Sequence, residues 1–157
     1  RELFGLKSGT NVDPGEYLGM DVERRRDALD FLAGIERDEE DVRIAFTGAP
    51  NMIDIEWFAS GQDIARVLQR LAALEDKTAL DILAVNPSMS DGMQGQWDYV
   101  GYKGGSEPGV LNLSWLLRDA AGDWAVVSLR WNNPDAAVDH STFDLLAMRA
   151  IAMLAGE

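Results

Sequence analysis

The chain has 157 residues, of which 46% are hydrophobic and 26% charged, the composition of a globular domain that builds its own core. The absence of Cys excludes a disulfide scaffold and a thiol nucleophile, and a single histidine, His140, excludes any site that needs two imidazoles. With 14 Lys and Arg against 27 Asp and Glu, the formal net charge of −13 disfavours nucleic acid and acidic membrane surfaces as partners.

The start of the chain suggests a larger parent. Arg1 leads at once into the apolar segment Leu3-Phe4-Gly5-Leu6, from which we expect a piece cut from a longer polypeptide. No apolar run approaches the roughly 20 residues of a membrane-spanning helix, so no membrane span is predicted. The sequence also lacks internal repeats and low-complexity linkers, and residues 1–157 are therefore predicted to form a single domain or a fragment of one.

The N-terminal third is predicted to hold one long helix and one short strand. Asp13 can cap a helix that has Pro14 at its first position, and apolar residues continue the pattern over 14–35 with an interruption near Gly19. The acidic run 38–41 is expected to be a solvent-facing loop, because it lacks the spacing and the Gly of a calcium loop. The alternation over 42–46 predicts a short strand.

Two helices are predicted in the middle of the chain. Ser60 and Asp63 resemble a capping box, and the stripe Ile64, Val67, Leu68 and Leu71 predicts an amphipathic helix that packs on a sheet. A second helix is expected over about 76–84, up to Asn86-Pro87. Turn-forming residues over 88–95 predict a loop.

The C-terminal third predicts a sheet followed by a helix. Runs over 97–103, 110–118 and 124–132 are rich in Val, Leu, Trp and Tyr, and the connections 104–109 and 119–123 suit an antiparallel meander. A helix of about 20 residues should start at Asn133-Pro134-Asp135 and end near Gly156, apolar over most of its circumference. The predicted fold class is α+β, with the three-strand antiparallel sheet over 97–132 packed against helices.

The common catalytic motifs are missing. The sequence has no Gly-x-Gly-x-x-Gly, no phosphate-binding loop and no Gly-x-Ser-x-Gly, so neither a nucleotide site nor an α/β-hydrolase elbow is indicated. Asp139, His140 and Ser141 are adjacent on the predicted helix, point in different directions and cannot form a triad by themselves. We expect no cofactor and no metal.

The segment Lys103-Gly104-Gly105-Ser106 carries the strongest chemical signal. It lies at the end of the first predicted sheet strand, where glycines let a ligand approach the backbone and leave N–H groups free to donate. The same four residues also make an ordinary hairpin loop. Their neighbours in the chain are therefore needed to interpret them.

The order of elements around this segment resembles the C-terminal half of class A-like serine β-lactamases and penicillin-binding proteins. An amphipathic helix beginning at Ala59-Ser60-Gly61 precedes it, two strands and a terminal helix follow it, and the segments 56–60 and 1–7 are similar to a bacterial branch of these hydrolases. The resemblance implies a transpeptidase-like fold, incomplete in this chain, and an extracytoplasmic bacterial location. It assigns catalytic roles to Lys103, as a positive charge, and to Ser106, through its backbone N–H in an oxyanion hole. Gly104 and Gly105 would bind substrate.

The nucleophile of that family is absent from this chain. None of Lys7, Lys77 and Lys103 has a Ser three positions before it, and Gly104 stands where the family has Thr or Ser. The chain is therefore expected to be part of a hydrolase that acts on an amide or ester through an acyl-enzyme, with a small-molecule or peptide-like substrate. A companion chain or self-association would complete the fold. The alternatives are a non-catalytic α+β binding module, whose exposed aromatic residues bind a protein or small ligand, and a catalytically dead relative.

Overall fold

The computed structural model describes residues 6–7, 12–36, 39–40, 43, 55 and 58–156, which fall into two compact units. Unit 1 comprises residues 1–57 together with Glu107–Val110 and Asn132–Val138, and unit 2 comprises Phe58–Ser106, Leu111–Trp131 and Asp139–Glu157. The strand predicted over 42–46 lies outside the described residues except for Arg43, which is helical. The acidic run is described only at Glu39 and Glu40, which are also helical.

Unit 1 contains helices α2 (Pro14–Gly19) and α3 (Val22–Ala33), so the predicted interruption of the long helix is confirmed. Asp13 and Asp21 cap the two helices by accepting hydrogen bonds from backbone N–H groups three residues on, which gives each helix its own start. The core of the unit joins residues far apart in the sequence, namely Leu6, Tyr17, Leu32 and Ile55. An ion pair of 2.5 Å between Lys7 Nζ and Glu107 Oε2 also lies within this unit.

Unit 2 is built on a three-stranded antiparallel sheet, as predicted. The strands are β1 (Tyr99–Glu107), β2 (Val110–Arg118) and β3 (Trp124–Asn132), and they pair in the order β1-β2-β3. The central strand β2 is almost continuously apolar, and its residues Leu113–Leu117 are all buried. Such a run is typical of a strand covered on both faces.

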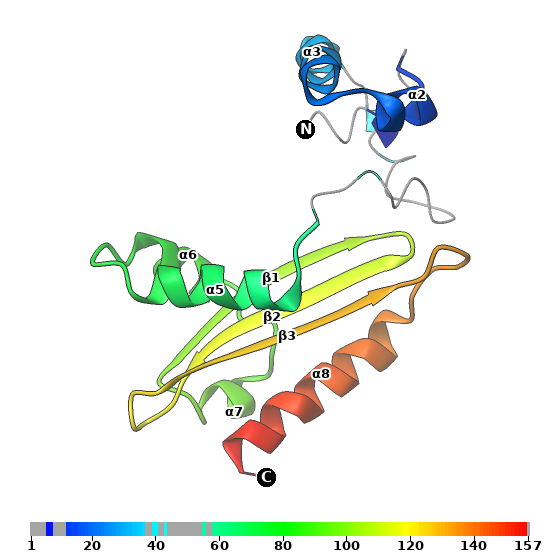
Figure 1. Cartoon of the computed structure of the whole chain (residues 1–157). Coiled ribbons are helices and arrows are strands. Elements are labelled where there is room, and N and C mark those ends of the chain that lie inside the picture. The colour runs from blue at the N-terminus through cyan, green and yellow to red at the C-terminus, as the bar shows by residue number, and fades with distance from the viewer. Residues whose placement is uncertain are drawn as a thin grey trace. The chain divides into compact units, whose positions relative to one another are not determined.

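Helices lie on both faces of this sheet (Figure 1). On one face α5 (Gly61–Ala72) and α6 (Thr78–Ala84) bury Leu68 and Leu80 against Leu116. On the other face lies α8 (His140–Ala155), in which the ring of Phe143 is 6.0 Å from that of Trp131. Odd-numbered residues of β2 and β3 therefore face α8, because successive side chains of a strand alternate between its faces.

The predicted start of α5 is confirmed in detail. The Ser60 hydroxyl accepts a hydrogen bond from the Asp63 N–H at 3.1 Å, and the Asp63 carboxylate accepts one from the Ser60 N–H at 2.9 Å. These bonds complete a capping box. The Ser60 hydroxyl also donates to the Asp63 carboxylate at 2.6 Å, and this bond, followed by that from the Ser60 N–H, holds the pKa of Asp63 below its ordinary value. The capped helix then buries its apolar stripe against the sheet.

Two predicted boundaries and one predicted loop were wrong. The strand β1 continues through Gly104 and Gly105 to Glu107, and the turn is formed by Pro108 and Gly109 alone. Helix α8 begins at His140 because the Asn133 side chain accepts from the N–H groups of residues 135 and 136, which makes a local turn, while Asp139 provides the cap. The loop predicted over 88–95 contains one helical turn, α7 (Asp91–Gln94).

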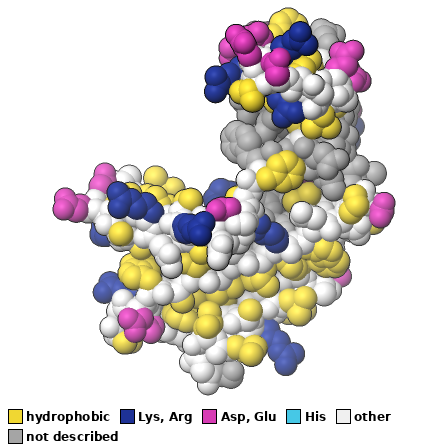
Figure 2. Space-filling model, in the orientation of Figure 1, with side chains coloured by type: hydrophobic (Ala, Val, Ile, Leu, Met, Phe, Trp, Pro, Cys, Tyr) yellow, Lys and Arg dark blue, Asp and Glu magenta, His cyan; other side chains and the backbone are white. Residues whose placement is uncertain are grey.

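Helix α8 keeps an exposed apolar face opposite its buried one. Phe143, Ala147 and Ile151 are buried, whereas Leu145 and Met153 remain 72% and 70% exposed, in agreement with a helix predicted to be apolar over most of its circumference. Figure 2 shows hydrophobic side chains gathered on the surface of this part of the molecule. No Trp-rich face forms among the described residues, since Trp115 is buried, Trp97 and Trp131 are half-buried, and Trp124 is 38% exposed.

Across the described residues, no helix combines the length and the apolar character that crossing a membrane requires.

Candidate ligand-binding site

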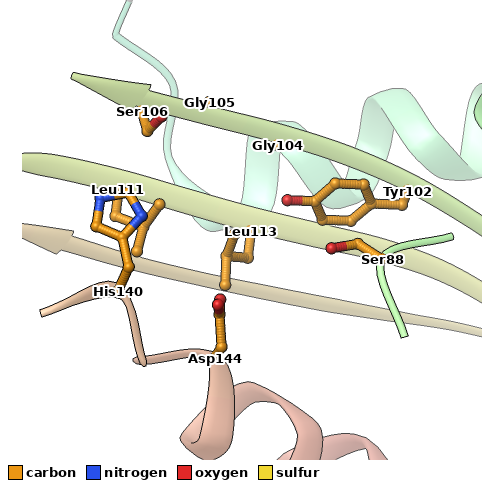
Figure 3. A pocket seen from close by; sticks show the side chains of 9 residues that line it. All are labelled: Ser88, Tyr102, Gly104, Gly105, Ser106, Leu111, Leu113, His140 and Asp144. Atoms are coloured by element: carbon orange, nitrogen blue, oxygen red, sulfur yellow. The ribbon is translucent and has the colours of Figure 1, made fainter. Parts of the chain in front are cut away.

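An open pocket of about 360 Å³ lies within unit 2 on the face of the sheet that carries α8. Four separate segments supply its lining: the connection between α6 and α7, the strands β1 and β2, and the start of α8. The lining residues are Ser88, Tyr102, Gly104, Gly105, Ser106, Leu111, Leu113, His140 and Asp144. The two leucines are buried and form an apolar floor, while Ser88, Ser106, His140 and Asp144 are exposed polar residues at the rim (Figure 3).

The strand β1 lines the pocket through Tyr102, Gly104 and Ser106, which lie two residues apart and so on one face of the strand. A Cβ on Gly104 would lie 2.8 Å from Cζ of Tyr102, too close for any real side chain. Gly104 therefore leaves the space in which the Tyr102 ring lies along the strand. A pair of the same kind occupies the opposite face, where a Cβ on Gly101 would lie 2.9 Å from Cε1 of Tyr99.

The Tyr102 ring is held by contacts on several sides. Its centroid is 5.0 Å from that of the buried Trp115, and the Ser88 side chain lies beside it (Figure 3). Partial burial raises the pKa of the Tyr102 hydroxyl, the Ser88 side chain lowers it, and the negative charge of Asp144 raises it further. The Asp144 side chain points from α8 toward this wall (Figure 3). Its field therefore acts inside the pocket.

Ser88 adopts a left-handed backbone conformation with φ of 50°, and no other non-glycine residue in the described part of the chain has a positive φ. This conformation costs free energy for a residue with a side chain, and it persists because the neighbouring segment is fixed. The Trp115 indole N–H donates to the Pro87 carbonyl at 2.9 Å, and the Ser88 N–H donates to the Asn86 side chain at 3.3 Å. The strained residue is one that lines the pocket, as strained residues at ligand sites often do.

The start of α8 brings His140 and Asp144 to the same side of the pocket. The two residues are four apart, so they lie on one face of the helix. Asp139 caps this helix: its carboxylate accepts from the Thr142 N–H at 3.1 Å and from the Thr142 hydroxyl at 2.7 Å. These bonds, with that of the hydroxyl the larger influence, hold the pKa of Asp139 below its ordinary value of 3.8.

The structure gathers three of the four site residues predicted from the sequence. Gly104, Gly105 and Ser106 line the pocket, whereas Lys103 does not, and its ammonium donates to the Gly104 carbonyl. Lys103 and Ser106 are three residues apart on one strand, so their side chains leave opposite faces of the sheet. The roles assigned to Lys103 and Ser106 remain predictions.

Sequence analysis did not identify Ser88, Tyr102 and Asp144 as site residues. The sequence did contain a signal for Tyr102, because residues 102, 104 and 106 are two apart and so lie on the same face of a strand. Asp144 also had one, because it follows His140 by one helical turn. Ser88 carried no such signal, because its place depends on the folded course of the connection between α6 and α7.

Comparisons with known proteins add no family: no protein-family model matches the chain, and no curated protein matches it significantly. Within the part of the chain that the structure describes, no three His, Asp or Glu side chains come together as ligands for a metal ion.

The pocket offers hydroxyl groups, strand backbone, one imidazole and one carboxylate over an apolar floor. This arrangement can hold a small polar molecule that also has an apolar part.

Proposed function

We propose that this chain is a binding module for a small polar molecule, and that the pocket on the α8 face of the sheet is its binding site. The observation that carries the proposal is the convergence of polar side chains from four segments over the buried floor of Leu111 and Leu113. A volume of about 360 Å³ falls within the range of small-molecule sites, which spans roughly 300–1,000 Å³. The openness of the pocket favours a weak, rapidly exchanging ligand.

The strained backbone at Ser88 supports the proposal independently. A residue held in the left-handed region costs of order 1–3 kcal/mol, and folded proteins tend to keep such residues where a site requires them. Here the strained residue is Ser88, which lies beside Tyr102 in the wall of the pocket. The wall is thus set before any ligand arrives, and binding spends little free energy on ordering it.

A mixture of small polar fragments, screened by ligand-observed NMR, tests this function. Ser106→Phe places a large ring at the pocket rim and should abolish binding. The matched control Ser141→Phe changes an exposed serine that does not line the pocket, and it should bind fragments like the parent chain. Fragments that bind Ser106→Phe as well as the parent chain would contradict the proposed site.

A second candidate function follows from the resemblance to serine β-lactamases and penicillin-binding proteins. We propose it because Gly104, Gly105 and Ser106, which the resemblance assigns to substrate and oxyanion binding, all line the pocket. In this proposal the chain contributes part of an extracytoplasmic bacterial hydrolase. The nucleophile that forms the acyl-enzyme comes from a separate segment that carries Ser-x-x-Lys.

A fluorescent penicillin and a serine-reactive phosphonate separate the two candidates. The chain alone should remain unlabelled, because it contains no Ser-x-x-Lys motif. Addition of a segment with that motif should give labelling on the added segment. Covalent labelling of the isolated chain, or failure of any such segment to become labelled, would refute the hydrolase candidate and leave the binding module unaffected.

A further inference from the structure

The fixed charge of the pocket is negative. Among the nine lining residues, Asp144 is the one with a carboxyl side chain, and the lining contains neither Lys nor Arg. The influence of Asp144 reaches across the pocket, because its charge acts on the hydroxyl of Tyr102 on β1. A ligand in this space therefore lies within the field of a carboxylate.

The N-terminus of α8, next to the pocket, does not make the charge of the pocket positive. The N-terminus of a helix attracts anions through its free N–H groups, but here the Asp139 carboxylate already accepts from Thr142. Asp139 thus adds a second negative charge beside His140, the first residue of α8. The cap therefore leaves no uncompensated positive helix end beside the pocket, and Asp144 is the carboxylate that an anionic ligand would meet there.

The Lys and Arg residues of β1 and α8 do not line the pocket. The Lys103 ammonium donates to the Gly104 carbonyl, and its side chain leaves the opposite face of β1 from Tyr102. Arg149 follows Asp144 by five residues, which rotates it by about 140° around the helix axis. Neither residue lines the pocket, so neither neutralises Asp144 there.

We propose that the ligand is a small organic cation, a hydroxylated primary amine whose ammonium group pairs with the Asp144 carboxylate. This inference rests on the proposed binding function and specifies the ligand of the same site. The hydroxyl groups of Ser88, Tyr102 and Ser106 offer hydrogen-bond partners to the polar end of the ligand. Leu111 and Leu113 contact its carbon atoms.

Three probes of nearly equal size test the sign of the charge: ethanolamine as cation, ethylene glycol as neutral molecule and glycolate as anion. Each is titrated into the full-length, ¹⁵N-labelled chain at constant ionic strength. The backbone amides of Gly104 and Gly105 and the indole N–H of Trp115 serve as local reporters. The expected result is a saturable shift of these signals with ethanolamine in the millimolar range, and weaker binding of the other two probes.

Variants then locate the cation. Asp144→Asn should weaken ethanolamine binding about tenfold, because a hydrogen bond with a charged partner is lost. The control Glu75→Gln removes an exposed carboxylate that does not line the pocket and should leave the affinity unchanged. Loss of affinity in both variants would indicate general charge attraction and would overturn the assignment to Asp144.

The outcomes distinguish the ligand class from the function itself. Binding of glycolate or ethylene glycol with equal or higher affinity at the same reporters would overturn the cationic ligand and keep the pocket as a binding site. Absence of a saturable shift with all three probes and with a wider fragment set would overturn both proposals.

Discussion

Replacement of Gly104 by Ala tests how the pocket wall is built. A Cβ at this position would lie 2.8 Å from Cζ of Tyr102, so the ring has to leave its place beside Trp115 and Ser88. Extra volume forced into a packed site typically costs about 1–3 kcal/mol, of which the lost aromatic contact accounts for about 0.5–1.5 kcal/mol. Ala in a strand gains roughly 0.5–1 kcal/mol over Gly, so Gly104→Ala should lower the free energy of unfolding by about 1 kcal/mol.

Gly105→Ala is the matched control, because nothing lies within 4 Å of a Cβ built there. This variant should be more stable than the parent by about 0.5–1 kcal/mol, which separates the two alanine variants by about 2 kcal/mol. Urea unfolding followed by Trp fluorescence measures the difference. The indole N–H signal of Trp115 should move in Gly104→Ala and stay in place in Gly105→Ala.

A double-mutant cycle shows whether the cost arises from Tyr102. In a Tyr102→Leu background, the smaller side chain leaves room for the new Cβ, and Gly104→Ala should no longer be destabilising. Equal stability of the two alanine variants, or an unchanged cost of Gly104→Ala after removal of the tyrosine ring, would refute the reasoning.

Three further predictions concern helix α8 and unit 1. Ile151→Ala should cost about 2–5 kcal/mol in urea unfolding because Ile151 is fully buried, whereas Met153→Ala, at a side chain 70% exposed, should cost little; equal costs would contradict the two-sided description of α8. The pKa of Asp139 is lowered in the folded state, so its contribution to stability is present above its ordinary value of 3.8 and is lost as pH falls through the folded value. Asp139→Asn should therefore show a shallower loss of melting temperature in acid, and an unchanged acid profile would argue against the cap. In unit 1, Lys7→Met should cost about 3–5 kcal/mol, because it removes one member of the ion pair between Lys7 and Glu107, whose side chains are 5% and 12% exposed. The double variant Lys7→Met with Glu107→Leu should recover much of this loss, and a double variant as unstable as the single one would contradict the pairing.

The sheet and the helix caps could be predicted because their signals are local. The bounds of β2 and β3 agree with the predicted runs, and the capping box at Ser60 follows from residues three apart. The end of β1 was misplaced because Gly104 and Gly105 suggest a turn in isolation. In the fold, pairing with β2 and the covering ring of Tyr102 keep this segment extended.

The pocket was only partly predictable, because its members come from four segments. The alternation of side chains along a strand relates Tyr102 to Ser106, but no local sequence pattern shows that Asp144 of α8 lines the same pocket. That relation depends on which face of the sheet α8 covers, and on a helix start seven residues later than Asn133 suggested. Placement of such residues requires the packing of the helix on the sheet, which the contact of Phe143 with Trp131 fixes.

The two tyrosine–glycine pairs of β1 give this chain a recognisable fingerprint. Tyr99-Val100-Gly101 and Tyr102-Lys103-Gly104 repeat every three residues on a strand whose faces alternate every two, so each face receives one ring and one gap. The tyrosine ring and the glycine constrain each other, because a Cβ at the glycine position would collide with the ring. A relative with a larger residue in place of the glycine should therefore also lack the tyrosine. Paired exchange of these positions would therefore identify distant relatives that overall sequence similarity fails to detect.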